Sequence, residues 1–273
     1  MHWINNFPIA LGCGCVLFFN LVSPHALADT VKVGGTGSAL GTIQRLAEAY
    51  ALKHPGSKVI AIEGLGSSGS IKAVTAGALD ISLSARPLKP AERAENLTEK
   101  EIARTPLVLA SMRKHDGFTM ADIAKIFDGS LSTWPDNSPL RPILRPDSDA
   151  ESALLRAISP EIDRALSMAH QRKGVHLAIT DQDSADAIEK IPGAIGTSTL
   201  ALILSERRKI TALPLNGVAP SLSSLAEGRY HLYKPLYLIT RQTPSNSAQG
   251  FIAFIYSKAG HQVLSDNGFL LKP

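Results

Sequence analysis

Residues 31–84 read VKVGGTGSALGTIQRLAEAYALKHPGSKVIAIEGLGSSGSIKAVTAGALDISLS and decide the fold. Two runs of β-type residues, 31–33 and 58–63, each end in a turn rich in Gly and Ser, and a third run follows at 80–84. Between the first two runs, residues 42–53 place apolar side chains on one face at helical spacing, and a shorter helical pattern precedes the third run. Strands that alternate with helices in this way predict a parallel sheet with helices packed on its faces.

The alternation continues through the rest of the chain, without an internal repeat or a low-complexity tract. Further strands are expected at 107–111, 140–144 and 232–240, with a strand-like segment from 193, and further helices at 119–127, 151–158, 160–169, 183–190 and 248–257. The sequence therefore predicts an α/β protein over nearly its whole length.

The composition is that of an ordinary globular protein, with 44% hydrophobic and 19% charged residues. The chain has 28 Lys and Arg against 24 Asp and Glu, a net charge of +4. This surplus is too small to indicate nucleic-acid binding, and it is compatible with a small anionic ligand.

The first 28 residues are typical of an export signal. Residues 9–22 are largely apolar, and residues 25–28 (HALA) end in a small-x-small pattern. We therefore expect a signal peptide at 1–28, cleavage after Ala28 and a periplasmic mature protein. The front end carries His2 but no Lys or Arg, so a buried N-terminal helix and a membrane anchor are the alternatives, although the apolar run is short for a span.

Both cysteines of the chain, Cys13 and Cys15, lie in this segment. The mature chain would then have no disulfide, no thiolate nucleophile and no Cys-ligated metal. A lipid anchor on Cys13 is a poor match, because the apolar stretch continues after it through residues 16–19.

Three β-to-α turns rich in Gly and Ser are candidate binding elements: 34–41, 64–70 and the segment after Arg145, which carries Ser148. A helix N-terminus leaves backbone N–H groups unpaired and carries partial positive charge. Gly lets a ligand approach the backbone, and Ser adds a hydroxyl donor, so such turns suit oxyanions. Each serine alone could equally be an N-cap. Three such turns, each after a strand, favour anion binding.

Residues 64–69, GLGSSG, also fit the dinucleotide-binding fingerprint. The helix after them is short, and the third strand ends at Ala85-Arg86 without an acidic residue to hold a ribose, so we expect no cofactor. The acid pairs at 147–149 and 181–183 do not continue as calcium loops, and we expect no metal. Nucleophile-elbow, zinc-protease and phosphate-loop motifs are missing from the sequence, which predicts a binding protein without catalytic residues.

The order of the motifs resembles that of the phosphate-type periplasmic solute-binding proteins of ABC transporters. The matching segments are VGGTGS at 33–38, GLGSSGS at 64–70, AGALDISLSARPL at 76–88, AKIFDG at 124–129 with Trp134, NGVAP at 216–220 and GRYHL at 228–232. The resemblance covers nearly all of the mature chain. It implies a type II periplasmic binding fold, in which two Rossmann-like lobes joined by two crossing strands close on a ligand like a hinge.

The resemblance also implies a domain division. We expect lobe one at 29–113 plus 234–273 and lobe two at 114–233, with crossings near 114–118 and 219–233. The implied function is that of a monomer that captures phosphate or a related small oxyanion and delivers it to an ABC permease, without a nucleic-acid partner; a membrane sensor is the other partner considered.

The site residues that the resemblance implies are Ser38, Ser67, Ser68, Ser84, Arg86, Arg145 and Ser148. The serines would donate hydrogen bonds to the anion, and the arginines would supply positive charge. Arg86 is equally suited to a structural ion pair with Asp80.

The match to the family fails after Arg145. Where the family continues with Gly-Ser-Gly-Thr, residues 148–152 read SDAES, and Ala85 stands where phosphate receptors can carry an aspartate. A carboxylate that faces an oxyanion in a dry site is repulsive unless a proton bridges the two. Asp149 and Glu151 therefore either point outward, or the ligand is not phosphate. The second candidate is a periplasmic signalling or interaction module on the same fold with altered or lost anion binding.

Overall fold

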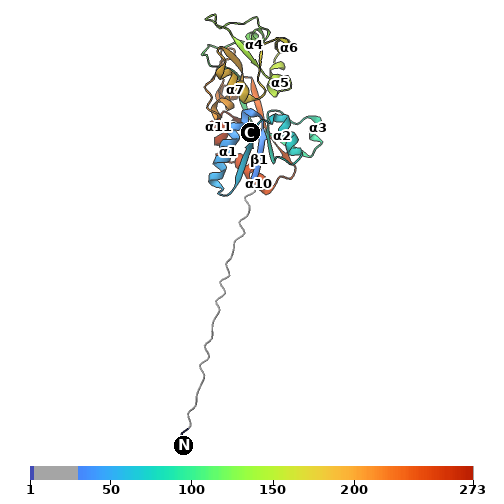
Figure 1. The fold of residues 1–273 in the computed structure, drawn as a ribbon, viewed down its shortest axis with the longest axis vertical. Coiled ribbons are helices and arrows are strands. Elements are labelled where there is room, and N and C mark those ends of the chain that lie inside the picture. The colour runs from blue at the N-terminus through green and yellow to red at the C-terminus, as the bar shows by residue number, and fades with distance from the viewer. Residues whose placement is uncertain (3–29, 273) are drawn as a thin grey trace.

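The chain forms two α/β lobes that share a mixed ten-stranded sheet (Figure 1). The computed structural model describes residues 1–2 and 30–272. Except for its first two residues, the predicted signal peptide, with Cys13, Cys15 and the cleavage site after Ala28, lies outside the described residues.

The elements alternate along the chain much as the sequence pattern predicts. The strands are β1 (Thr30–Gly35), β2 (Lys58–Ile62), β3 (Ile81–Ser84), β4 (Leu97–Ser111), β5 (Arg141–Leu144), β6 (His176–Leu177), β7 (Ala194–Thr199), β8 (Thr211–Ala212), β9 (Tyr233–Arg241) and β10 (Leu270–Leu271). The helices are the 3-10 turn η1 (Gly37–Ala39), α1 (Leu40–Lys53), α2 (Gly66–Thr75), α3 (Pro90–Arg93), α4 (Met120–Asp128), α5 (Ala150–Arg156), α6 (Pro160–Gln171), α7 (Asp181–Lys190), α8 (Leu200–Ser205), α9 (Leu222–Ala226), α10 (Asn246–Ile255) and α11 (Lys258–Asp266). The strand order is β2-β1-β3-β9-β4-β7-β5-β6, and β8 and β10 also pair with β4.

The predicted parallel unit at the N-terminus is confirmed. β1 pairs in parallel with both β2 and β3, so that Val33 lies opposite Ala61 on one side and Ile81 on the other. Helix α1 packs on this unit through buried side chains that include Ile43 and Leu46. The Gly- and Ser-rich turns after β1 and β2 therefore lie at the same edge of the sheet as the end of β3, because carboxyl ends of parallel strands meet there.

Two antiparallel strands, β4 and β9, make the sheet mixed, since β9 runs antiparallel to both β3 and β4. The sequence pattern predicts only residues 107–111 of β4. Residues 97–101, LTEKE, alternate partly buried and exposed positions and carry three charges, so they lack an apolar run. The helix predicted at 248–257 is α10, and it is followed by α11, which the pattern did not predict.

The two larger hydrophobic clusters each fill one lobe, and a small third cluster of Ile71, Leu88 and Ile239 lies between α2 and β9. In β4 the change from one cluster to the other falls between Ala103 and Leu107, and near the start of β9 it falls between Leu232 and Leu236. The division into 29–113 plus 234–273 and 114–233 stays a prediction. The buried side chains favour a first crossing inside β4, ahead of 114–118.

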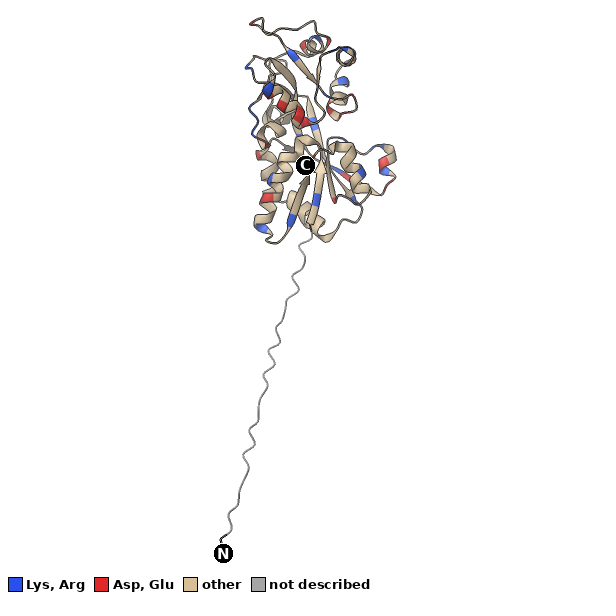
Figure 2. Ribbon diagram, viewed as in Figure 1, with Lys and Arg blue, Asp and Glu red and all other residues tan. Residues whose placement is uncertain are grey.

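Charged residues of both signs are interspersed over both lobes (Figure 2). This distribution agrees with the small net charge of +4. In the part of the chain that the structure describes, the helices are all too short or too polar to cross a bilayer.

The close pairing of β1 and β3 predicts the effect of one substitution. A Cβ at Gly35 would lie 2.0 Å from the carbonyl oxygen of Leu83, so the two strands would have to separate. We expect Gly35→Ala to lower the free energy of unfolding by about 1–3 kcal/mol in urea denaturation. Gly69→Ala is the control, because its Cβ would lie 3.6 Å from the Leu65 Cβ and alanine favours helix. An equal loss in both variants would contradict this explanation.

Candidate functional site

The first Gly- and Ser-rich turn is fixed to the sheet and presents a backbone N–H group to lobe two. The Thr36 N–H donates to the carbonyl oxygen of Leu83 at 2.8 Å, which holds the turn beside the end of β3. Ser38 is buried, and its Oγ lies 3.0 Å from Thr36 Oγ1. The Ser38 N–H donates to Asp181 Oδ2 at 3.0 Å. This turn therefore already holds an oxygen anion, the carboxylate at the start of α7.

Four other predicted residues lie together at the same sheet edge, where β3 ends and α2 begins. Ser67 Oγ accepts a hydrogen bond from the Ala85 N–H at 2.9 Å, and Ser84 Oγ donates to the Arg86 carbonyl oxygen at 2.7 Å. Ser68 Oγ accepts from Arg86 Nη2 at 3.0 Å. The hydroxyl groups of these three serines thus bond to residues 85 and 86, directly after β3.

Arg86 forms an ion pair within lobe one. Its Nη1 and Nη2 donate to the two carboxylate oxygens of Glu92 at 2.7 and 2.8 Å, and this hydrogen bonding lowers the pKa of Glu92. Asp80, the partner considered from the sequence, instead accepts from the Lys32 N–H at 2.8 Å. Arg86 therefore forms a structural ion pair, but its partner is Glu92 and not Asp80.

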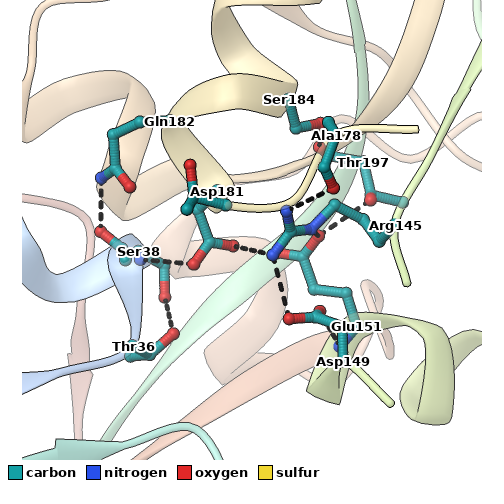
Figure 3. A network of polar contacts seen from close by, with 12 residues as sticks. Thr36, Ser38, Arg145, Asp149, Glu151, Ala178, Asp181, Gln182, Ser184 and Thr197 are labelled. Carbon is teal, nitrogen blue, oxygen red and sulfur yellow. Dashed lines mark hydrogen bonds and ion pairs between the residues drawn. The ribbon is translucent and has the colours of Figure 1, made fainter. Parts of the chain in front are cut away.

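Arg145 lies at the end of β5 and is nearly fully buried, with 5% of its surface exposed. Its Nη1 donates to the carbonyl oxygen of Ala178 at 2.8 Å, and its Nη2 donates to Asp149 Oδ2 at 2.9 Å. The same Nη2 lies 3.9 Å from Asp181 Oδ1 (Figure 3). Its Nε is buried without a hydrogen-bond partner among the described residues, 3.8 Å from Glu151 Oε2.

A fully buried lysine completes the charge network. Lys234, in β9, donates from Nζ to Glu151 Oε1 at 2.9 Å and to Asp181 Oδ1 at 3.0 Å. Thr197 Oγ1, in β7, donates to Glu151 Oε2 at 2.8 Å. We use the name buried charge network for Arg145, Asp149, Glu151, Asp181 and Lys234. It joins α5 and α7 to β5 and β9 where the lobes meet.

The two acids that replace the family's donors do not point outward. Asp149 caps α5 by accepting from the Glu151 N–H at 2.8 Å and binds Arg145. Glu151 is 1% exposed and faces Lys234. Ser148, in contrast, is exposed in the turn before α5 and is not brought to the other predicted residues. The local break in the family motif thus places negative charge against Arg145 and Lys234.

The titration of the network follows from burial and charge together. Burial raises the pKa of Glu151 to about 7, because Lys234 only partly offsets it and Asp181 adds repulsion. Burial would also raise the pKa of Asp181, but Lys234 and Arg145 outweigh it and hold that pKa below its usual range. Against the effect of burial, Asp181 and Glu151 raise the pKa of Lys234. Glu151 is therefore the group whose charge changes near neutral pH.

The sequence reasoning did not identify Asp181 and Lys234 as site residues. Asp181 was noticed only as one of a pair of acids. Lys234 stands in the apolar segment LYKPLYLIT at 232–240, and a lysine in a buried strand needs an acidic partner. That signal could have found the lysine. It could not have found its partners, which lie 53 and 83 residues away.

The arrangement is suited to binding, because several donors converge on one oxyanion. Asp181 receives hydrogen bonds from a backbone N–H and an ammonium group, with a guanidinium group nearby. In residues 1–2 and 30–272, no group of three or more His, Cys, Asp or Glu side chains is placed to hold a metal ion.

Comparisons with known proteins agree with this architecture. The sequence model of a family described as "PBP superfamily domain" matches residues 22–259. The phosphate-binding protein PstS of Bacillus subtilis (strain 168) is 22% identical over 257 residues, which cover 89% of this chain and 81% of that protein.

Two solved structures share the fold at low sequence identity. One is a substrate-binding protein from Clostridium perfringens with bound phosphate, with a TM-score of 0.76 and 20% identity over 90% of this chain and 100% of that one. The other is an ABC-type phosphate transport receptor from Vibrio cholerae, with a TM-score of 0.64 and 17% identity over 89% and 100% of the two chains. The predicted resemblance and the type II periplasmic binding fold are therefore confirmed. The chain therefore belongs to the family described as the PBP superfamily domain, and its two lobes with their shared mixed sheet agree with that membership.

Proposed function

We propose that the mature chain is an exported solute-binding receptor that takes a small oxyanion, phosphate first among them, in a cleft between its lobes. The observation that carries this proposal is the position of Asp181, a carboxylate held by the Ser38 N–H and Lys234 Nζ at 3.0 Å each. Donors that hold one oxyanion suit another of similar size. The relatives named for phosphate binding support phosphate as the first ligand to test.

The proposed ligand contacts come from both lobes. Ser38, Ser67, Ser68 and Ser84 line the sheet edge of lobe one, and Arg145 faces them from lobe two. Arg86 would contact the anion only after giving up its bond to Ser68 Oγ, and Ser148 only after its turn moved inward. We place these last two residues at the border of the site.

We propose a wider role that the family and the expected signal peptide support. The chain is exported, is cleaved after Ala28, acts as a monomer in the periplasm without catalysis, and delivers its ligand to an ABC permease. A receptor of this kind needs a closed state with the anion between the lobes and an open state that releases it.

Titration calorimetry of the mature chain with inorganic phosphate tests the proposal, with ³¹P line broadening as a second readout for weak binding. We expect one site. Arg145→Lys should weaken binding about tenfold or more, because an ammonium group cannot reproduce the planar fork of the guanidinium group. Arg164→Lys is the matched control, since Arg164 is exposed on α6 and pairs with Glu161. Absence of binding to phosphate, sulfate, molybdate, tungstate and arsenate would refute the anion receptor.

One observation favours the second candidate, an interaction module with altered or lost anion binding. Asp149 and Glu151 stand where the family has donors, and together with Asp181 they neutralise Arg145 and Lys234 from within. A folded chain that binds none of the five anions, from a locus without permease and ATPase genes, would support this module, with a membrane sensor as its partner.

A further inference from the structure

We propose that Asp181 is an internal ligand: its carboxylate occupies the anion position at the first Gly- and Ser-rich turn, and an oxyanion from solution binds there only by displacing it. This inference rests on the proposed function and deepens it. It assigns to one side chain of lobe two the control of both ligand affinity and lobe closure.

The first support is that both carboxylate oxygens of Asp181 are held as a bound oxyanion would be. Oδ2 accepts from the Ser38 N–H at 3.0 Å, and Oδ1 accepts from Lys234 Nζ at 3.0 Å, with Arg145 Nη2 at 3.9 Å. Figure 3 shows Asp181 between Ser38 and Arg145, the two predicted ligand contacts of opposite lobes. An anion that bridged these two residues would need the same place.

The second support is the close approach of α7 to the turn. A Cβ at Gly37 would lie 2.6 Å from Asp181 Oδ2 and 2.9 Å from its Cβ, so only glycine lets the carboxylate come this near. Gln182 Nε2 donates to the Gly37 carbonyl oxygen at 2.9 Å and to Glu206 Oε1 at 2.7 Å. The N-terminus of α7 is thus docked on η1 by several contacts.

The third support is the lack of room beside Asp181 and the negative charge around it. Asp181 is 8% exposed and Ser38 is 1% exposed, and the Nη atoms of Arg145 bind Asp149 and Ala178. A second anion beside three carboxylates would meet strong repulsion at low dielectric. Displacement of Asp181 takes one of these three carboxylates away and frees the Ser38 N–H in the same step.

Asp181→Asn separates this inference from its alternatives. Asparagine has the same shape but no negative charge, so it competes less well for the Ser38 N–H and for Lys234. By calorimetry with inorganic phosphate at fixed pH and salt, we expect Asp181→Asn and Asp181→Ala to bind about tenfold or more tightly than the unaltered chain. In small-angle X-ray scattering without phosphate, both variants should show a larger radius of gyration, because the contact between α7 and η1 is released.

Two control variants test whether the loss of any nearby negative charge would raise the affinity for phosphate equally. Asp183→Asn makes the same change at an exposed position in the first turn of α7, where the carboxylate accepts from the Thr180 N–H at 3.0 Å, and it should leave affinity unchanged. Asp149→Asn removes a network charge that does not contact Ser38 and should give a smaller gain. If Asp149→Asn raises affinity as much as Asp181→Asn, the effect is general charge and the internal ligand is refuted.

The remaining outcomes are also decisive. Equal phosphate affinity in Asp181→Asn and the unaltered chain overturns the internal ligand but leaves the anion receptor standing. If neither binds phosphate, the anion receptor and this inference both fail. Tighter binding together with an unchanged radius of gyration would overturn the role of Asp181 in closure while its role in affinity held.

Discussion

Replacing Lys234 by Met is expected to destabilise the protein by about 3–5 kcal/mol, because it leaves buried carboxylates without their main counter-charge. Lys234 is 1% exposed, and its Nζ lies within 3.0 Å of both Glu151 and Asp181. Methionine fills a similar volume but cannot donate. Urea denaturation at pH 8 measures the loss, and the loss should shrink at pH 5 as Glu151 takes up a proton.

The double variant Lys234→Met, Glu151→Gln gives an internal check on this cause. Removing Glu151 together with Lys234 should restore part of the lost stability, because the double variant no longer leaves the Glu151 carboxylate buried without its lysine partner. Lys272→Met is the control for loss of an exposed ion pair, because Lys272 is half-exposed beside Glu101, and it should cost about 1 kcal/mol or less. A loss below about 1 kcal/mol for Lys234→Met would mean that the network does not need its lysine.

The second large effect is a pH dependence carried by Glu151. Its pKa is about 7 in the folded protein, chiefly because of burial, against an ordinary value of 4.5. The folded state therefore binds the proton more tightly than the unfolded chain. The stability from this group is fully present below pH 4.5 and is lost as the pH rises through about 7. The unfolding free energy should fall by roughly 2–3 kcal/mol between pH 5 and pH 8.

Glu151→Gln should flatten this slope, because glutamine does not titrate but can still accept from Lys234. Glu92→Gln is the comparison. The hydrogen bond from Arg86 lowers the pKa of Glu92, so this carboxyl group changes stability with pH only below about pH 4.5. Its slope between pH 5 and pH 8 should match that of the unaltered chain. Urea midpoints and slopes at half-unit pH steps provide the measurement. A slope that persists in Glu151→Gln would assign the titration to another group.

Much of the fold could be predicted from local patterns. Helix α4, at Met120–Asp128, lies within one residue of the predicted 119–127, because the Thr119 hydroxyl caps it and Gly129 ends it with φ of 86°. The strand β4 was predicted for only a third of its length. Its N-terminal part, residues 97–101, pairs with β9 and is half-exposed, so charged residues are tolerated there and an apolar run is not required.

For the candidate site too, local features could be predicted from the sequence, whereas long-range contacts could not. The sequence by itself determined the Gly- and Ser-rich turns after β1 and β2, since a tight turn at a strand end depends on neighbouring residues. It also placed Arg145 beside a motif that departs from its family. Only the tertiary structure decided what those groups bind, because Ser38 meets Asp181 across 143 residues and Lys234 meets Glu151 across 83. Such contacts depend on how the two lobes pack together. Lys234 needs two acidic partners only because it is buried, and it becomes buried only when the lobes have packed.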